Sequence, residues 1–93
     1  MNEEVVLKVK GDTNPNKLGG ALVKYLKEGH KVVQITGMGP HAVNQMVKGI
    51  IVGRTYLSAE AMDLEAVPGF LTRKEDGREV TLIVYRVSLK RPN

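Results

Sequence analysis

Apolar residues follow two different spacings along the chain, and each change of spacing marks a boundary between elements. Residues 5–10 and 31–36 are rich in Val, Leu and Ile and are followed by glycine, which predicts two short strands. Between them, from Asn14-Pro15 to Gly29, apolar residues recur every three or four positions, as in an amphipathic helix with proline in its first turn. The predicted apolar stripe of this helix is Leu18, Ala21, Leu22, Tyr25 and Leu26.

A second, longer helix is predicted from about Pro40 to Tyr56. It begins with the same signal as the first helix, because Gly39 precedes a proline. Its predicted apolar stripe is Val43, Met46, Val47, Ile50 and Ile51, with the stem of Arg54 at the edge. Two strands joined through a helix are expected to lie parallel, with a right-handed crossover.

The last third of the chain has the pattern of a β-hairpin. Residues 62–72 and 78–89 are rich in β-forming residues and flank Glu75-Asp76-Gly77, a turn sequence of the Asp-Gly kind. The order of elements is therefore βαβαββ. We expect an α/β protein of the two-layer α+β kind, in which a four-stranded mixed sheet carries two helices on one face.

The final strand is apolar on both of its faces. Its two alternating sets are Val80, Leu82 and Val84, and Ile83, Tyr85, Val87 and Leu89. A strand with one face in water would be polar at every second position. Either both faces are covered within the chain or one meets another chain, and we expect a homodimer or a higher homo-oligomer.

Length and composition narrow the class of protein. The chain has 93 residues, enough for one small core, so residues 1–93 are expected to form a single domain. It has no cysteine, which excludes disulfides, thiol nucleophiles and cysteine-ligated zinc. The start, Met1 to Glu4, is acidic, and no stretch approaches the roughly 18 apolar residues of a membrane span. We expect a cytoplasmic protein that does not enter a membrane.

The net charge of +4 lies entirely in the first part of the chain. Residues 1–54 hold eight basic and four acidic residues, whereas residues 55–93 hold six of each. A mild basic excess is compatible with phosphate-bearing partners and is also ordinary for a small protein. Charge therefore permits nucleic-acid binding without requiring it.

Two loops, residues 12–17 and 37–41, each lead into a helix that starts with proline. If the first two strands are parallel, both loops lie at the same edge of the sheet, and both helices offer unpaired amide donors there. Lys17 and His41 lie in the first turns, where they are placed to meet a phosphate. Simple helix capping explains the same residues, so an anion site and a pair of caps are alternative interpretations.

Polar side chains also follow the second helix outside its apolar stripe. His41, Asn44 and Lys48 are spaced at i, i+3 and i+7, which suits contact with a nucleic-acid backbone or base edge and equally suits a solvated face. The hairpin tip adds basic residues, but residues 73–79 hold three basic and three acidic side chains and are neutral overall.

Four glycines lie inside the predicted helices, where each costs up to about 1 kcal/mol relative to alanine. They are Gly19, Gly20, Gly49 and Gly53. We interpret them as points of close backbone packing rather than of ligand contact.

Catalysis finds little support in the sequence. His30 and His41 have no carboxylate partner at a spacing that predicts a proton relay. The main acidic group, residues 60–65, lacks the histidines that most transition-metal sites use. The aromatic residues are dispersed, whereas proteins that stack single-stranded bases need an array of them. We expect no enzyme, no metal and no cofactor.

Two segments resemble the stage V sporulation protein S (SpoVS) family. Residues 14–22, NPNKLGGAL, are similar to the Pro-Asn-Ser-x-Ala-Gly-Ala start of that family's first helix. Residues 42–48, AVNQMVK, are similar to its Ala-x-Asn-Gln-Ala-Val-Lys segment, and Val67-Pro68-Gly69-Phe70 resembles its Pro-Ala-Phe stretch. The resemblance extends over nearly the whole chain.

That family is similar in turn to the Alba-type chromatin proteins, which implies a βαβαββ fold, a dimer and binding to DNA or RNA. The resemblance places the nucleic-acid surface on the first-helix loop, the start of the second helix and the hairpin. On this chain the implied residues are Asn16, Lys17, His41, Asn44, Lys48, Arg73, Lys74 and Arg78. The implied role is regulation of gene expression or of sporulation-type development. The alternatives are a protein-interaction module on the same fold and a phosphate or nucleotide binder at the helix N-termini.

Overall fold

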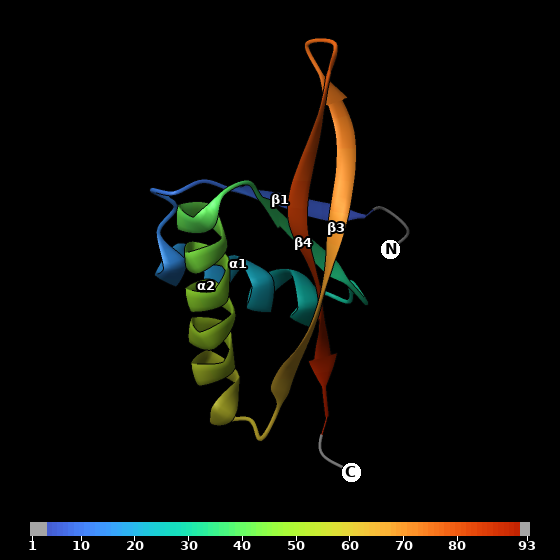
Figure 1. Ribbon diagram of the computed structural model, residues 1–93. Coiled ribbons are helices and arrows are strands. Elements are labelled where there is room, and N and C mark those ends of the chain that lie inside the picture. Colours follow the sequence, from blue (N-terminus) through green and yellow to red (C-terminus); the bar gives the residue numbers. More distant parts are fainter. Residues whose placement is uncertain (1–3, 92–93) are drawn as a thin grey trace.

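Six elements follow one another in the order that the sequence pattern predicts. The computed structural model describes residues 4–91, and the acidic start, Met1 to Glu3, lies outside the described part. The elements are β1 (Val5–Val9), α1 (Pro15–Lys27), β2 (Val33–Gly37), α2 (Pro40–Ser58), β3 (Asp63–Glu75) and β4 (Arg78–Lys90) (Figure 1).

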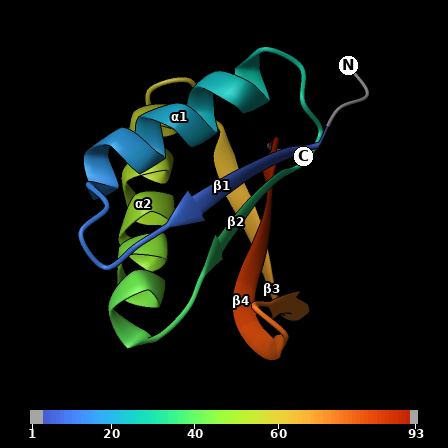
Figure 2. The same cartoon turned by 90° about the horizontal axis from the view of Figure 1, so that it is seen from above.

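The four strands form one mixed sheet in the order β1-β2-β4-β3. β1 and β2 are parallel, with Val5 opposite Val33, and β4 is antiparallel to both of its neighbours. Both helices lie on the same side of the sheet, which leaves the other face without a covering layer (Figure 2). The predicted four-stranded mixed sheet with two helices on one face is confirmed.

The hairpin is longer than the sequence pattern predicts. β3 and β4 each have 13 residues and pair along their whole length up to Glu75 and Arg78. Asp76 and Gly77 alone form the turn, with φ of 52° and 77°, because such a turn needs positive φ at both central positions. The hairpin therefore projects well beyond the rest of the sheet (Figure 1).

The core lies between the helices and the sheet. The predicted stripe of α1 is confirmed, since Leu18, Leu22 and Leu26 are buried there. The fully buried side chains that meet them include Val33 and Ile35 of β2, Met46 and Leu57 of α2, and Val87 of β4.

The predicted stripe of α2 is partly wrong. Its buried residues are Ala42, Met46, Gly49, Gly53 and Leu57, whereas Val47 and Ile51 are 38% and 53% exposed. The reason is the close crossing of the two helices, which places the glycine side of α2, rather than its bulkiest apolar side, against α1.

The glycines make that crossing possible. A Cβ atom on Gly19 would lie 2.8 Å from the carbonyl oxygen of Gly49, and one on Gly49 would lie 2.5 Å from Cδ2 of Leu18. A Cβ atom on Gly53 would similarly meet Leu64 of β3 at 2.8 Å. The interpretation of these three glycines as packing positions is confirmed. Gly20 differs, because the nearest atom to its Cβ position is 4.0 Å away.

Neither helix in the described part of the chain, residues 4–91, has the length and apolar character needed to cross a bilayer.

Candidate functional site

The loops that precede the two helices meet at one edge of the sheet, as the parallel pairing of β1 and β2 predicts. The side-chain amide of Gln45 donates a hydrogen bond of 2.8 Å to the backbone carbonyl of Thr13. A Cβ atom on Gly11 would lie 3.0 Å from Cβ of His41, so the two segments are in close contact. The start of α1 and the start of α2 are thereby held together.

The first turn of α1 is capped by its own sequence. Oδ1 of Asn14 accepts hydrogen bonds from the amides of Asn16 at 2.8 Å and Lys17 at 3.3 Å. Pro15, in the first turn, has no amide to satisfy. The expectation of unpaired donors at this helix is therefore wrong for these amides, and α1 offers little to an anion.

The first turn of α2 has a different chemistry. Its N-cap is Gly39, whose φ of 87° suits glycine and which has no side chain to accept from the first amides. Neither helix has an acidic residue in its first turn. The two helices cross steeply, so their N-termini do not point in one direction (Figure 1). Only α2 keeps the features of an anion-attracting helix start.

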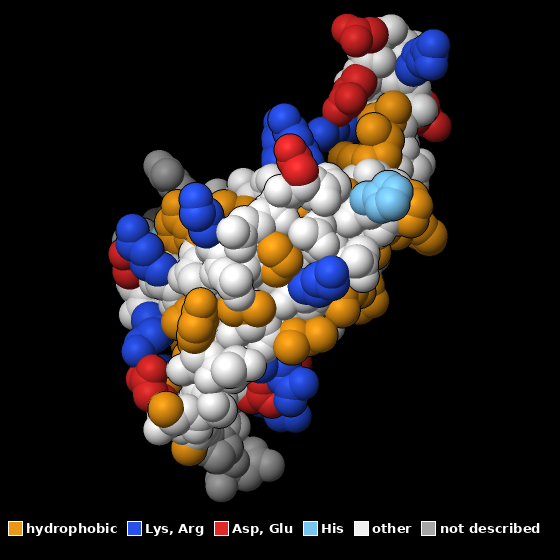
Figure 3. Space-filling model, turned by 90° about the vertical axis from the view of Figure 1, so that its left-hand side faces the viewer, with side chains coloured by type: hydrophobic (Ala, Val, Ile, Leu, Met, Phe, Trp, Pro, Cys, Tyr) orange, Lys and Arg blue, Asp and Glu red, His pale blue; other side chains and the backbone are white. Residues whose placement is uncertain are grey.

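Five of the eight predicted residues lie on the two helices, four of them within the first two turns and Lys48 further along α2. They are Asn16 and Lys17 on α1, and His41, Asn44 and Lys48 on α2. All five side chains are exposed, and within residues 4–91 neither lysine takes part in an ion pair. Basic side chains on the face shown in Figure 3 are separated by uncharged ones rather than joined in a patch.

The three hairpin residues form a separate group whose charge is largely compensated. Nε of Arg73 lies 2.8 Å from Oε2 of Glu75. In the strand register, Lys74 stands opposite Glu79 and Arg78 stands opposite Glu75. Each basic side chain of the tip therefore has a carboxylate beside or across from it, which lowers the potential that the tip presents to a phosphate.

Sequence reasoning missed two lysines that the structure brings to the hairpin. Lys8 and Lys10 lie at the end of β1 and line one cleft together with Arg73. Their spacing of two residues in a strand places both on the same face of the sheet. That alternation is visible in residues 5–10 and is the signal that could have identified them.

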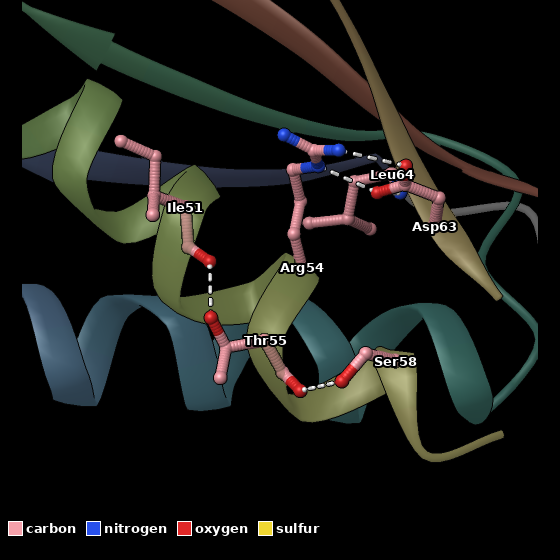
Figure 4. A network of polar contacts seen from close by, with 6 residues as sticks. All are labelled: Ile51, Arg54, Thr55, Ser58, Asp63 and Leu64. Atoms are coloured by element: carbon pink, nitrogen blue, oxygen red, sulfur yellow. Dashed lines mark hydrogen bonds and ion pairs between the residues drawn. The ribbon is translucent and has the colours of Figure 1, made fainter. Parts of the chain in front are cut away.

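An ion pair joins the end of α2 to the start of β3 (Figure 4). Arg54 binds Asp63 through two hydrogen bonds, from Nε to Oδ1 at 2.7 Å and from Nη2 to Oδ2 at 3.1 Å. Oδ1 also accepts a hydrogen bond of 2.7 Å from the amide of Leu64. The bonds from Arg54, and then the amide of Leu64, hold the pKa of Asp63 below its usual range. This pair has a structural role, since it fixes the connection between two elements.

The acidic group considered as a metal site is divided between two ion pairs. Glu60 binds Nζ of Lys27 at 2.8 Å, which ties the end of α1 to the loop after α2, and Asp63 binds Arg54. Across the described residues, no three His, Asp or Glu side chains are grouped as they would be around a metal ion.

Large apolar side chains are exposed on the helix side of the sheet. They include Val47, Ile51 and Tyr56 on α2 and Phe70 on β3, which is 79% exposed. We call Val47, Ile51 and Phe70 the apolar flank. Phe70 shares its strand face with Leu64 and Ala66 of the core. Figure 3, which views the molecule from the side of α2, shows hydrophobic side chains gathered along one edge of this face.

The face of the sheet that no helix covers, here called the bare face, exposes less apolar surface than the pattern of β4 predicts. Leu82 and Val84 lie on it, yet they are only 5% and 9% exposed. At Leu82, the aliphatic stems of long neighbours contribute to this burial, because Lys8 and Arg73 line the same cleft. Contact with a second chain is therefore not needed to cover these two residues.

Comparisons with known proteins agree with this architecture. Twelve solved chains are similar to this one. Among them is Alba from Thermoplasma volcanium, with a TM-score of 0.54 and 13% sequence identity over 92% of this chain and 99% of that one. At this level of identity the likeness concerns the fold alone, and it confirms the Alba-like fold. The family model for stage V sporulation protein S (SpoVS) matches residues 5–90, so the chain belongs to the SpoVS family and is a small sporulation-related protein with an Alba-like fold.

Proposed function

We propose that this protein is a homodimeric nucleic-acid-binding regulator, without enzymatic activity, that acts in gene expression or in sporulation-type development. One observation carries the proposal. Two helix starts are held together at one edge of the sheet, and neither helix has an acidic residue in its first turn. Lys17 is exposed in the first turn of α1, and Lys48 is exposed further along α2. Such a surface attracts phosphates through its lysines and the N-terminus of α2, while Asp12, exposed in the loop before α1, opposes this attraction in part.

The binding surface is the helix-start group: Asn16, Lys17, His41, Asn44 and Lys48. Lys17 and Lys48 contact phosphates, and the two asparagines and the histidine supply hydrogen bonds that orient the strand or duplex. The hairpin residues Arg73, Lys74 and Arg78 contribute less, because carboxylates compensate their charge. Affinity is therefore mainly electrostatic, with little reading of base sequence.

The apolar flank forms the dimer contact in this proposal. It exposes Phe70, Ile51 and Val47 on the side of the sheet that also carries the helix starts. Burying large apolar side chains against a second copy stabilises the pair and completes the core of a small domain. A dimer also doubles the number of lysines that one nucleic acid can meet, which raises its affinity.

The decisive experiment measures binding to duplex DNA, single-stranded DNA and RNA over a series of salt concentrations. We expect wild type to bind at low salt, and we expect the logarithm of its affinity to fall linearly with the logarithm of salt concentration. The variant Lys17→Glu/Lys48→Glu binds more weakly and shows a shallower slope, by roughly 0.9 for each duplex phosphate contact that is lost.

The matched control is Lys24→Glu/Lys31→Glu. It makes the same change in net charge at two exposed lysines outside the helix-start group. If charge alone controlled binding, both variants would fail equally. Binding of wild type to none of the three polymers at low salt contradicts the proposal.

A protein-interaction module is the second candidate, favoured by the compensated charge of the hairpin tip. In that case a protein partner is captured in the presence of nuclease, and Lys17→Glu does not affect its capture. If nuclease treatment abolishes capture of the protein partner, nucleic acid bridges the two proteins, and the nucleic-acid proposal is favoured.

A further inference from the structure

The bare face of the sheet carries a cleft that the helix-start group does not include. The cleft has a volume of about 320 Å³ and lies where β1 and β2 end and the hairpin crosses them. β1 and β2 are parallel, and the cleft lies at their carboxyl ends, the position where open α/β sheets bind ligands. It is large enough for a small molecule and too small for a folded partner.

The rim of the cleft is basic. Lys8, Lys10 and Arg73 line it, and Glu75 is the one carboxylate among its lining residues, so the rim carries a net charge of +2. Arg73 is held by Glu75 at 2.8 Å, whereas neither lysine takes part in an ion pair within residues 4–91. Two ammonium groups on one face of one strand are thus available to a bound anion.

The floor of the cleft is apolar. Leu82 is 5% exposed at its base, and Met38, at the rim beyond β2, is 57% exposed. A thioether that stands free at a rim adapts to a flat aromatic ring and makes favourable sulfur–aromatic contact. Thr36, which is 3% exposed and the one polar side chain classed as buried between residues 4 and 91, also lines the cleft.

We propose that this cleft binds a nucleotide, with Lys8 and Lys10 at its phosphate and Met38 and Leu82 against its base. A ligand with an anionic end and a flat apolar end matches the two halves of the cleft, whereas an inorganic anion would use only the rim. The nucleotide is either free in solution or one unit of a single strand. Lys8 and Lys10 are not members of the helix-start group, so variants of the two sets of residues test this site and the proposed function separately.

The test is a titration of isotopically labelled protein, followed by NMR, with adenosine monophosphate, inorganic phosphate and a short adenine oligonucleotide. We expect saturable shifts at Thr36 and Met38 with adenosine monophosphate or with the oligonucleotide. The variant Lys8→Gln/Lys10→Gln weakens binding by roughly tenfold or more, because it removes two charge-assisted contacts. Its matched control, Lys24→Gln/Lys31→Gln, has the same net charge and leaves affinity unchanged.

Two further arms separate the sources and the parts of the ligand. If the Lys8→Gln/Lys10→Gln variant loses affinity for adenosine monophosphate, the ligand is a free nucleotide. If it loses affinity for the oligonucleotide alone, the ligand is one nucleotide unit of a single strand. Met38→Ala weakens nucleotide binding severalfold and leaves inorganic phosphate unaffected, because the thioether contacts only the base.

Lys17→Glu/Lys48→Glu retains mononucleotide binding, which separates this proposal from the helix-start surface. Absence of saturable shifts with both nucleotide probes, or equal affinity of the Lys8→Gln/Lys10→Gln variant and wild type, overturns the proposal.

Discussion

The two faces of the sheet differ in how far their large apolar side chains are exposed, and the presence of the helix layer on one face does not explain the difference. The helix side has a second layer but leaves Phe70 79% exposed, whereas the bare side has no layer and buries Leu82 to 5%. Phe70 lies on β3, the edge strand of the sheet, opposite Ile83 of β4, so it has a neighbouring strand on one side only. On the bare side, the stems of Lys8 and Arg73 lie beside Leu82 in the cleft.

This difference separates two kinds of surface. The helix side carries an uncovered apolar flank next to exposed lysines, which suits a large partner such as a second copy and a polymer. The bare side carries a small cleft with a charged rim, which suits a small ligand. Four variants or pairs of variants test this distinction.

The largest effect is expected from removing a core leucine on the helix side. Leu22 is fully buried, so Leu22→Ala leaves a cavity and lowers the free energy of unfolding by about 2–5 kcal/mol. Leu82→Ala costs less, about 1.5–3 kcal/mol, because the space opens into the cleft and admits water. Urea denaturation of both variants measures the difference, and an equal or larger loss at Leu82 would show that the bare face is as tightly packed as the core.

The next effect concerns dimer formation. Phe70→Ala removes the most exposed aromatic side chain of the apolar flank and weakens the dimer by about 2 kcal/mol, or roughly thirtyfold. Val67→Ala is the matched control, since Val67 is 60% exposed on the same strand but on the opposite face. Sedimentation equilibrium distinguishes them. If Val67→Ala dissociates the dimer and Phe70→Ala does not, the dimer contact lies on the bare face of the sheet and not on the apolar flank.

A smaller effect is expected at the helix crossing that holds the layer in place. Gly19→Ala forces a Cβ atom to within 2.8 Å of a backbone oxygen, so we expect a loss of about 1–3 kcal/mol despite the gain in helix propensity. Gly20→Ala meets nothing closer than 4.0 Å and stabilises the helix by up to about 1 kcal/mol. Thermal denaturation gives opposite shifts for the two variants. Shifts of the same sign would mean that the crossing relaxes easily.

The smallest effect concerns the exposed ion pair between α2 and β3. The pKa of Asp63 is lowered chiefly by its hydrogen bonds to Arg54, so its contribution to stability is present above the unfolded pKa, about 3.9. That contribution is lost as the pH falls through the lower folded pKa. Asp63→Asn should therefore destabilise the protein slightly at about pH 7, and the difference from wild type should shrink in acid. A difference that is constant down to about pH 2 would exclude the ion pair as its cause.

Much of the fold was predictable because local signals agree with the tertiary structure. Asn14-Pro15 and Gly39-Pro40 do begin the two helices, and Asp76-Gly77 forms the hairpin turn. These signals act through backbone dihedral angles and caps, which depend only on neighbouring residues.

The stripe of α2 was not predictable in the same way. Periodicity identifies which residues share a helix face, but Val47 and Gly49 lie on different faces and only packing decides which face is buried. Because α1 crosses α2 at Gly49, the smaller residues are inside and Ile51 is outside. Which face of α2 is buried therefore depends on where α1 packs against it, and the periodicity of α2 contains no information about α1.

The candidate site shows the same division. The sequence indicated Lys17 and Lys48 from their positions in two helices, and it indicated the neutral charge of the hairpin tip. It did not place Arg73 with Lys8 and Lys10, because these residues are far apart in the chain and meet only where the hairpin crosses the end of β1.

By itself, the sequence determined the six elements, their order, the turn and the distribution of charge, since each depends on short-range spacing and residue type. The tertiary structure decided which apolar residues are exposed, which amides are capped and which lysines share a cleft. These properties depend on contacts between residues distant in the chain, and the helix crossing and the twist of the hairpin set those contacts.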